Sequence, residues 1–368
     1  MKTAAKLAKS LLTILMPYPL IIYGAGASYG YLDIKKFSGS DQIGLSQWKA
    51  PLINNIFDAS RFGQIIGKYD DIKPLASAVI NITSGETPFD FEQYLTDLEE
   101  KYPENSYAKI MALRFYLAEL FGKVSHHYFR HTNNHNHLID EIRNRAGKAC
   151  IVNFNYDTLF EKNIKDIGSS NNLESYVQGD IKVIKVHGAH NWGFNPIYLP
   201  GKQDVYDYFI SKARELNEQY NGREIYPTTV GNFDYQEVDF NIQDFQKYNE
   251  EEGQWMYFLP AVAIPIGTKA AHVCPKNHIT VLEKELTLVD RILLIGWRAQ
   301  DEFLIELLKK HLQPNINLTI VSSNEAKARE VALKFKDITQ INYQNIQISK
   351  REGYTAFLAN REYETFFS

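Results

Sequence analysis

The feature that most constrains the fold of this 368-residue chain is a series of short, mainly apolar runs separated by segments with helical periodicity. Runs of this kind indicate strands that are buried on both faces. Strands that alternate with helices predict a Rossmann-like α/β fold, in which a parallel sheet carries helices on both faces. The predicted strands span residues 20–23, 149–154, 181–186, 291–295 and 318–321.

Two of these runs are followed by recognisable helix starts. After the fourth run, the sequence DEFLIELLKKHL places its apolar residues on one helical stripe, with Asp301 at the cap position and basic residues at the far end. After the fifth run, SNEAKAREVALKF also begins with residues that favour helix caps. Both segments predict helices that cover the sheet.

Two long segments interrupt this alternation. Residues 36–147 predict a largely helical inserted subdomain, while residues 194–257 are polar, rich in Tyr and only weakly periodic. Because a structureless loop of that length is unusual inside a compact domain, the second segment is interpreted as an inserted subdomain or a lid. The Rossmann-like domain would then comprise residues 1–35, 148–193 and 258–368.

Composition excludes several classes of protein. The formal net charge of -4 argues against a broad nucleic-acid-binding face, so no direct nucleic-acid binding is predicted. Lys6 and Lys9 interrupt the apolar start, which is therefore not read as a signal peptide, and no run approaches the ~20 apolar residues of a membrane helix. Cys150 and Cys274 are the only cysteines, too few for a disulfide framework or a four-cysteine zinc site. A cytoplasmic protein with no membrane contact is expected.

The first candidate motif, GAGASYG, directly follows the first predicted strand. It contains Gly24, Gly26 and Gly30, but Tyr29 stands where the common dinucleotide fingerprint has a glycine. Small residues at a strand end let backbone N–H groups approach a pyrophosphate, and Ser28 could add a hydroxyl. The alternative is a tight strand-to-helix turn that binds no ligand.

The second motif, IVNFNYDTLFEK, spans residues 151–162. Asn155 and Asp157 follow a strand at its carboxyl end, where open α/β sheets bind their ligands. Asp157 could instead simply cap the helix predicted to follow it. That alternative leaves Asn155 without a role.

The third motif, IKVIKVHGAHNW, ends a predicted strand at His187, which Gly188 follows. Histidine is the side chain whose ordinary pKa suits it to act as a base near neutral pH. A single histidine at a strand end is often a structural, hydrogen-bonded residue. Three polar groups at the ends of strands in one sheet nevertheless favour a shared site.

A cluster of histidines in residues 126–137 is the only candidate for a metal site. His127 and His131 would share a helix face, a spacing that suits a metal ion. No acidic or cysteine ligand accompanies them, so no metal is predicted.

Taken in chain order, these motifs resemble the sirtuin superfamily. They most resemble the bacterial sirtuin-like NAD-hydrolase domains of antiphage defence systems such as Thoeris and the HerA-associated systems. The resemblance covers residues 10–35, 148–193 and 258–340. It rests on GAGAS at 24–28, NFNYD at 153–157 and VHGAHNW at 186–192, with LLIGWRAQDEF at 293–303 resembling the family's late glycine-containing strand and VSSNEAKA at 321–328 its adenosine contact.

The resemblance implies that NAD is the substrate and assigns residues to its parts. Asn155 would hold the nicotinamide ribose or the attacking water, Asp157 would contact the nicotinamide region, and His187 would be the base. The cofactor-binding residues that it implies are Gly24, Ala25, Gly26 and Ser28 at the pyrophosphate, and Ser322 and Asn324 near the adenine ribose.

Departures from the family pattern distinguish its branches. Protein-deacylating sirtuins continue their glycine turn with Gly-Ile-Pro-Asp-Phe-Arg and carry a four-cysteine zinc module, whereas this chain has YGYLDIKKF and two cysteines. The resemblance therefore favours an NAD glycohydrolase that releases ADP-ribose and nicotinamide as an abortive-infection effector. It also implies a homo-oligomer and a partner such as a HerA-type ATPase. The alternatives are an NAD-dependent protein deacylase and a non-catalytic subunit that binds NAD or ADP-ribose within a defence complex.

Overall fold

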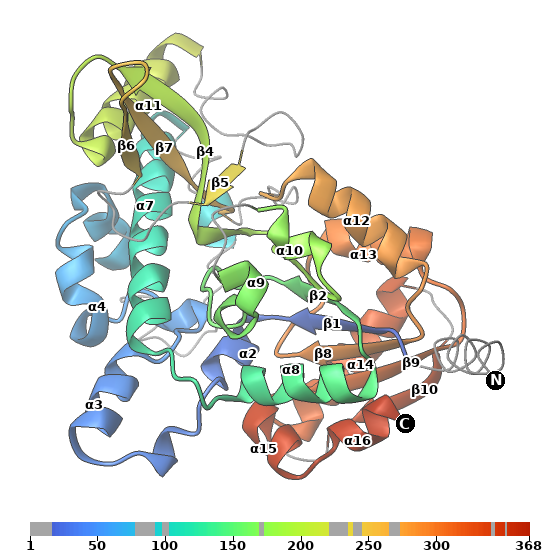
Figure 1. Cartoon of the computed structure of the whole chain (residues 1–368). Coiled ribbons are helices and arrows are strands. Elements are labelled where there is room, and N and C mark those ends of the chain that lie inside the picture. The colour runs from blue at the N-terminus through green and yellow to red at the C-terminus, as the bar shows by residue number, and fades with distance from the viewer. Residues whose placement is uncertain are drawn as a thin grey trace.

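The computed structural model describes residues 17–77, 93–97, 103–168, 173–220, 235–237, 245–264, 273–339, 343–349 and 352–368. At its centre lies a parallel six-stranded sheet in the order β10-β9-β8-β1-β2-β3 (Figure 1). This confirms the predicted fold class. The strands are β1 (Pro19–Tyr23), β2 (Ala149–Asn153), β3 (Ile181–Ile184), β8 (Arg291–Ile295), β9 (Ile316–Val321) and β10 (Tyr343–Ile348), the last of which was not predicted.

The order of the strands reverses once. The chain runs from β1 outward through β2 to β3, and then returns to the other side of β1 as β8 before continuing to β9 and β10. Tyr23 at the end of β1 pairs with Asn153 of β2 and with Ile295 of β8, so the three strands end level with one another. Doubly wound sheets bind ligands at this carboxyl edge, beside the reversal. Here the reversal lies between β1 and β8.

Helices cover both faces of the sheet, as predicted (Figure 1). On one face lie α12 (Lys276–Leu286), α13 (Glu302–His311) and α14 (Glu325–Thr339), which pack side by side. On the other lie α8 (Asn134–Arg145), α15 (Gly353–Ala359) and α16 (Tyr363–Phe367). Asp301 caps α13, because its Oδ1 accepts a hydrogen bond from the N–H of Leu304 at 2.8 Å.

The segment predicted to be a helical insertion is largely helical where the structure describes it. Its long helix α7 (Pro103–His127) packs against α3 (Gly39–Trp48), α4 (Ala59–Ile66) and α11 (Val205–Tyr220). Apolar residues at helical spacing on α7, including Ile110, Leu113 and Leu120, are buried. Shorter helical segments among the described residues include α2 (Ala25–Tyr29), α9 (Lys165–Gly168), α10 (Ser175–Gln178) and the 3₁₀ turns Ile34–Lys36, Ile53–Asn55, Asp70–Ile72 and Glu161–Asn163.

A second, antiparallel sheet in the order β5-β4-β7-β6 lies beside α7 (Figure 1). Its strands are β4 (Gly188–Leu199), β5 (Tyr235–Glu237), β6 (Gln246–Asn249) and β7 (Gln254–Val262). The predicted domain boundaries at residues 193 and 258 fall inside β4 and β7. The sequence did not reveal this sheet because β4 pairs with β7 across more than 50 intervening residues, and neither strand is a wholly apolar run.

Four expectations concern the start of the chain, a metal site, a membrane span and the surface charge. The expectation that the apolar start, residues 1–20, is not a signal peptide falls mostly outside the described residues, which begin at residue 17. Helix α7 ends at His127 and His131 lies in the next loop, so these two do not share a helix face. Within the described ranges, no group of three or more His, Cys, Asp or Glu is arranged to hold a metal ion.

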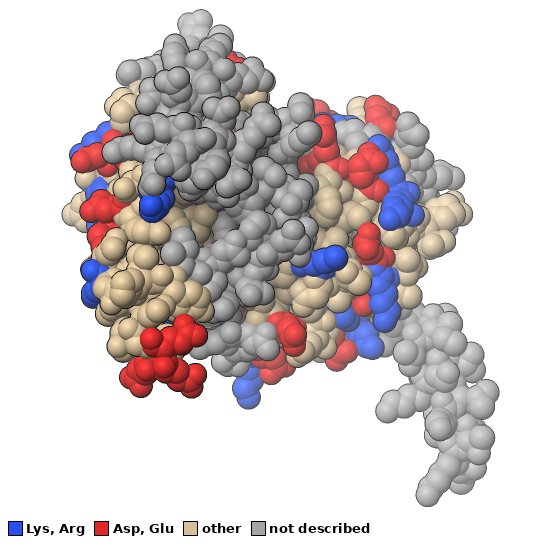
Figure 2. Space-filling model, turned by 90° about the horizontal axis from the view of Figure 1, so that it is seen from above, with Lys and Arg blue, Asp and Glu red and all other residues tan. Residues whose placement is uncertain are grey.

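None of the described helices is long and apolar enough to span a membrane. Basic and acidic side chains are interspersed on the described part of the face in Figure 2.

Candidate active site

The turn after β1 packs directly against the turn after β8. The N–H of Gly24 donates to the carbonyl of Ile295 at 3.0 Å, and that of Gly26 to the carbonyl of Gly296 at 3.4 Å. A Cβ on Gly24 would lie 2.4 Å from the oxygen of Gly296, and one on Gly296, whose φ is +64°, would lie 2.5 Å from the Cα of Gly26. Backbone contact at the reversal of the sheet therefore requires glycine at these positions. The pyrophosphate contacts of Gly24, Ala25 and Gly26 stay a prediction.

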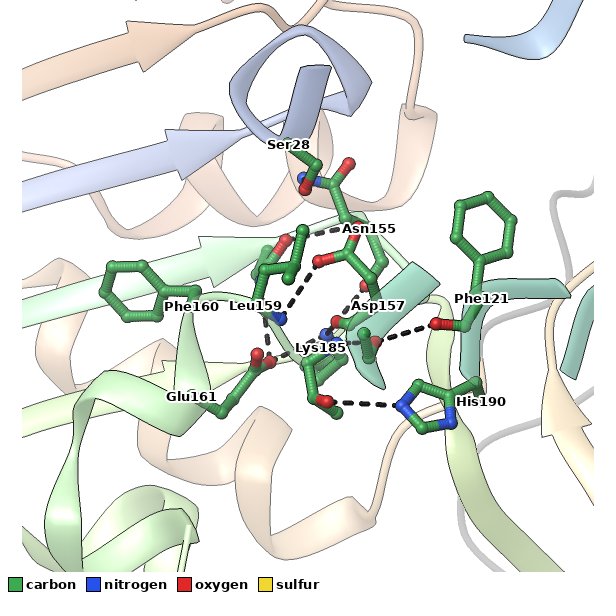
Figure 3. Close-up of polar contacts among 12 residues, drawn as sticks. Ser28, Phe121, Asn155, Asp157, Leu159, Phe160, Glu161, Lys185 and His190 are labelled. Carbon is green, nitrogen blue, oxygen red and sulfur yellow. Dashed lines mark hydrogen bonds and ion pairs between the residues drawn. The ribbon is translucent and has the colours of Figure 1, made fainter. Parts of the chain in front are cut away.

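Asn155 ties the end of β2 to this turn (Figure 3). Its Nδ2 donates to the carbonyl of Gly24 at 3.1 Å and to the Oγ of Ser28 at 2.9 Å. The residue is 7% exposed. Because both amide hydrogens are used inside the protein, Oδ1 is the atom through which Asn155 can accept a hydrogen bond from a ligand. The structure thus brings together Asn155 and Ser28, two of the predicted site residues.

A buried lysine holds the loop that follows β2 (Figure 3). The side chain of Lys185, which follows β3, is completely buried. Its Nζ donates to the carbonyls of Asn155 and Asp157, each at 2.7 Å, and forms an ion pair with Oε1 of Glu161 at 2.7 Å. The three donors of the ammonium group therefore each have an acceptor, as a buried charge requires. Lys185 therefore fixes the main chain at both Asn155 and Asp157.

Asp157 is almost fully buried, at 1% exposure. Burial raises the pKa of its carboxyl, and the nearby positive charge of Lys185 opposes that rise. The same two influences act on the pKa of Glu161, which is also raised. Oδ1 of Asp157 accepts from the N–H of Leu159 at 3.2 Å, so Asp157 stabilises a local turn that precedes the 3₁₀ turn Glu161–Asn163. Its contact with the nicotinamide region stays a prediction.

His187 lies just beyond the end of β3, with a side chain that is 19% exposed. Its Nε2 is 3.0 Å from Oδ2 of Asp301, the residue that caps α13. The ring also packs edge-on against Phe154, with centroids 4.9 Å apart, and Phe154 stacks on Trp297 with centroids 5.3 Å apart. Because Phe154 directly precedes Asn155, this packing brings the imidazole to the same edge as the amide. A carboxylate and an aromatic ring hold the imidazole in place.

The second sheet supports the turn that carries His187. The carbonyl of His187 accepts from the N–H of Ala263 at 2.9 Å, immediately after β7. Gly188 has a φ of +75°, and a Cβ there would lie 1.9 Å from the carbonyl oxygen of Ala261. The hydroxyl of Tyr156 donates to the carbonyl of Ala263 at 2.7 Å. The end of β7 thus contacts both the His187 turn and the loop of Asn155.

Ser322 and Asn324 follow the carboxyl end of β9. In the sheet, β8 lies between β9 and β1, the strand that the glycine turn follows. The carbonyl of Ser322 accepts from the N–H of Gly353 at 2.8 Å. Oδ1 of Asn324 accepts from the N–H of Lys327 at 2.9 Å, which makes Asn324 a cap of α14. Both lie on the predicted edge of the sheet, and their contacts with an adenine ribose stay a prediction.

Three residues of this edge were not predicted as site residues: Lys185, Glu161 and Asp301. The sequence contained one signal for Asp301, which was recognised as a helix cap. Its pairing with His187 depends on contact between residues 114 apart in the chain, and no local pattern reveals this.

No protein-family model matches this chain, and no curated protein matches it significantly. Solved structures similar to it include a Sir2 homologue in complex with NAD, at 12% identity and a TM-score of 0.37, covering 98% of this chain and 95% of that one. Another is a mutant Sir2 homologue in complex with 2′-O-acetyl ADP-ribose, at 13% identity and a TM-score of 0.41, covering 99% and 97%. A third is Sir2Tm bound to a propionylated peptide, at 14% identity and a TM-score of 0.36, covering all of both chains.

Proposed function

We propose that this protein is an NAD glycohydrolase that cleaves NAD to ADP-ribose and nicotinamide. The observation that supports the proposal is that an amide, Asn155, and a partly exposed imidazole, His187, both follow strands at the carboxyl edge of a doubly wound sheet. Both lie near the reversal between β1 and β8, where folds of this kind bind nucleotides. Hydrolysis of a glycosidic bond needs a base and a group that positions the attacking water or a ribose hydroxyl. His187 can act as the base, and Asn155 can position the water or hydroxyl.

His187 would act as the base. If Asp301 is ionised, Nε2 of His187 carries the proton that is shared with Oδ2, and Nδ1 is left to accept a proton from water or from a ribose hydroxyl. General-base catalysis of this kind contributes on the order of 10²- to 10⁴-fold in rate. Oδ1 of Asn155 would accept a hydrogen bond from the same water or hydroxyl and so fix its direction.

Asp157 would act electrostatically. Positive charge builds on the ribose as the bond to nicotinamide breaks, and glycosidases stabilise such charge with carboxylates. The ion pair between Lys185 and Glu161, together with the two carbonyls that Lys185 binds, would hold Asp157 and Asn155 in register with the substrate. Gly24, Ala25, Gly26 and Ser28 would face the pyrophosphate, and Ser322 and Asn324 the adenine ribose.

The test is to incubate the purified protein with NAD and resolve the products by chromatography. His187→Ala and Asn155→Ala are expected to keep the fold and to lower the rate of nicotinamide release at least 10²-fold. His131→Ala, which removes an exposed histidine outside the site, is the matched control and should leave the rate unchanged. A folded His187→Ala variant that releases nicotinamide at the parental rate would refute the assignment.

An acyl-lysine peptide separates this proposal from a deacylase. A glycohydrolase releases nicotinamide at the same rate with and without the peptide, whereas a deacylase needs it. The chain has two cysteines, which are too few for a four-cysteine zinc module of the deacylase type. Tight binding of NAD without any product would instead indicate a non-catalytic subunit.

The cellular role that we propose rests on the resemblance of the motifs. It is that of a cytoplasmic effector of antiphage defence, which acts as a homo-oligomer and is controlled by a partner such as a HerA-type ATPase. Adding candidate partners to the same NAD assay tests this role, because a regulated enzyme should release nicotinamide faster when its activating partner is present.

A further inference from the structure

Asp301 makes two hydrogen bonds that serve different purposes. Oδ1 accepts from the N–H of Leu304 at 2.8 Å and thereby caps α13, a helix of ten residues. Oδ2 lies 3.0 Å from Nε2 of His187. Because the helix fixes one oxygen of a planar carboxylate, the direction of the other oxygen is also fixed. The amino end of α13 favours negative charge at this position.

The loop that leads to Asp301 is itself tightly determined. Between β8 and α13, both Gly296 and Ala299 have a left-handed backbone, with φ of +64° and +53°. Ala299 is completely buried, and a non-glycine residue holds this conformation only when its surroundings impose it. Trp297 of the same loop stacks on Phe154, whose ring contacts the imidazole of His187. The loop therefore places the carboxylate and the aromatic support of the histidine together.

From this geometry we infer that Asp301 is a positioning residue for His187, an inference that rests on the function proposed above. Asp301 holds Nε2 in its protonated form and so presents Nδ1 to the substrate as the basic nitrogen. When Nδ1 takes a proton from the attacking oxygen, the imidazole becomes positively charged and the carboxylate stabilises that charge. Asp301 does not take up the proton itself.

The decisive variant is Asp301→Asn. Asparagine caps helices about as well as aspartate, so α13 is retained while the negative charge beside His187 is lost. We expect kcat for NAD cleavage to fall on the order of 10²-fold or more, with little change in KM. Asp58→Asn is the matched control, because Asp58 caps α4 through the N–H of Ser60 at 3.0 Å and should affect neither parameter.

A double variant shows whether Asp301 acts through the histidine. If it does, His187→Ala/Asp301→Asn should be no slower than His187→Ala alone, because the partner that Asp301 positions is already gone. Additive losses in the double variant would overturn the inference, as would an Asp301→Asn enzyme with parental kcat.

The imidazole can also be observed without substrate. Nitrogen-15 NMR of the ring, assigned by its loss in His187→Ala, should show Nε2 protonated in the parental protein and a changed proton distribution in Asp301→Asn. This signal does not depend on NAD cleavage. If the signal changes as expected but the parental protein cleaves NAD neither alone nor with the candidate partners, the pairing stands and the proposed function fails. An unchanged ring signal in Asp301→Asn would overturn the pairing, whatever the enzyme does.

Discussion

Replacing Gly296 by alanine should damage both the stability of the fold and the site. A Cβ at this position would lie 2.5 to 2.8 Å from three backbone atoms of Gly26 and Ala27, and no side-chain rotation can relieve contacts with backbone. The φ of +64° adds the strain of a left-handed conformation, about 1–2 kcal/mol. Overpacking of this kind costs about a further 1–3 kcal/mol. The expected loss in the free energy of unfolding is therefore about 2–5 kcal/mol.

A matched substitution separates the two contributions. Gly147 also has a positive φ, +72°, but a Cβ there would meet nothing within 4 Å. Gly147→Ala should therefore lose only the strain contribution, about 1–2 kcal/mol. With an unfolding entropy of about 2.1 cal/mol/K per residue, the 368 residues convert these losses to a Tm lowered by about 3–6 °C for Gly296→Ala and about 1–3 °C for Gly147→Ala.

The assay combines thermal melting with NAD cleavage, measured well below both melting temperatures. Gly296→Ala should push apart the turns after β1 and β8 and displace Trp297 and Asp301, so the rate of cleavage should fall more than the change in stability alone explains. Gly147→Ala should leave the rate of cleavage unchanged, because Gly147 lies between α8 and β2. If Gly296→Ala has a Tm no lower than that of Gly147→Ala, the close contact with the backbone of Gly26 and Ala27 is not what requires glycine at position 296.

Two further predictions concern buried charges. Lys185→Met should lower the free energy of unfolding by about 3–5 kcal/mol, because it removes the ion-pair partner of the buried Glu161 carboxylate. In a urea titration, Lys185→Met/Glu161→Gln should recover part of that loss, and a Lys185→Met variant as stable as the parent would contradict this. Acid should destabilise the protein below pH 6.5, because burial lowers the pKa of His135 to about 3, that of His278 to about 4 and that of His190 well below its ordinary value. Between the unfolded and folded pKa values of these histidines, the unfolded chain binds up to three more protons at the three sites, which contributes a slope approaching about 4 kcal/mol per pH unit near pH 5. The raised pKa values of Asp157 and Glu161 oppose part of this slope. Urea titrations showing no loss of stability between pH 7 and pH 5 would contradict the prediction.

The parts of this molecule that the sequence predicts are those encoded locally. Strand β1 is a run of apolar residues in which all five positions are buried. Strands β2 and β8 are also buried at all five positions, and each contains one polar residue, Asn153 and Arg291. Because parallel strands end at a common edge, the residues just after them, such as Asn155 and His187, could be placed on that edge without knowing the strand order. Asp301 was recognised as a cap for the same reason, since capping depends on the next few residues.

The parts that the sequence did not predict depend on long-range contacts. Lys185 lies between two buried apolar residues, Ile184 and Val186. Only the folded loop of Asn155 and Asp157, together with Glu161, shows how its charge is matched there. The antiparallel sheet likewise depends on pairing such as that of Phe194 with Leu259. In both cases the stabilising partner is too far along the chain for any periodicity to reveal it.

The position of His187 between two sheets explains why its geometry depends on both. Strand β3 of the parallel sheet ends at Ile184 and strand β4 of the antiparallel sheet begins at Gly188, so the chain passes from one sheet to the other within three residues. The carbonyl of His187 is held by the N–H that follows β7, while its ring is held by a loop that follows β8. The backbone of the histidine is thus fixed from the second sheet and its imidazole from the first. A displacement of either sheet would therefore change the direction in which the basic nitrogen faces the substrate.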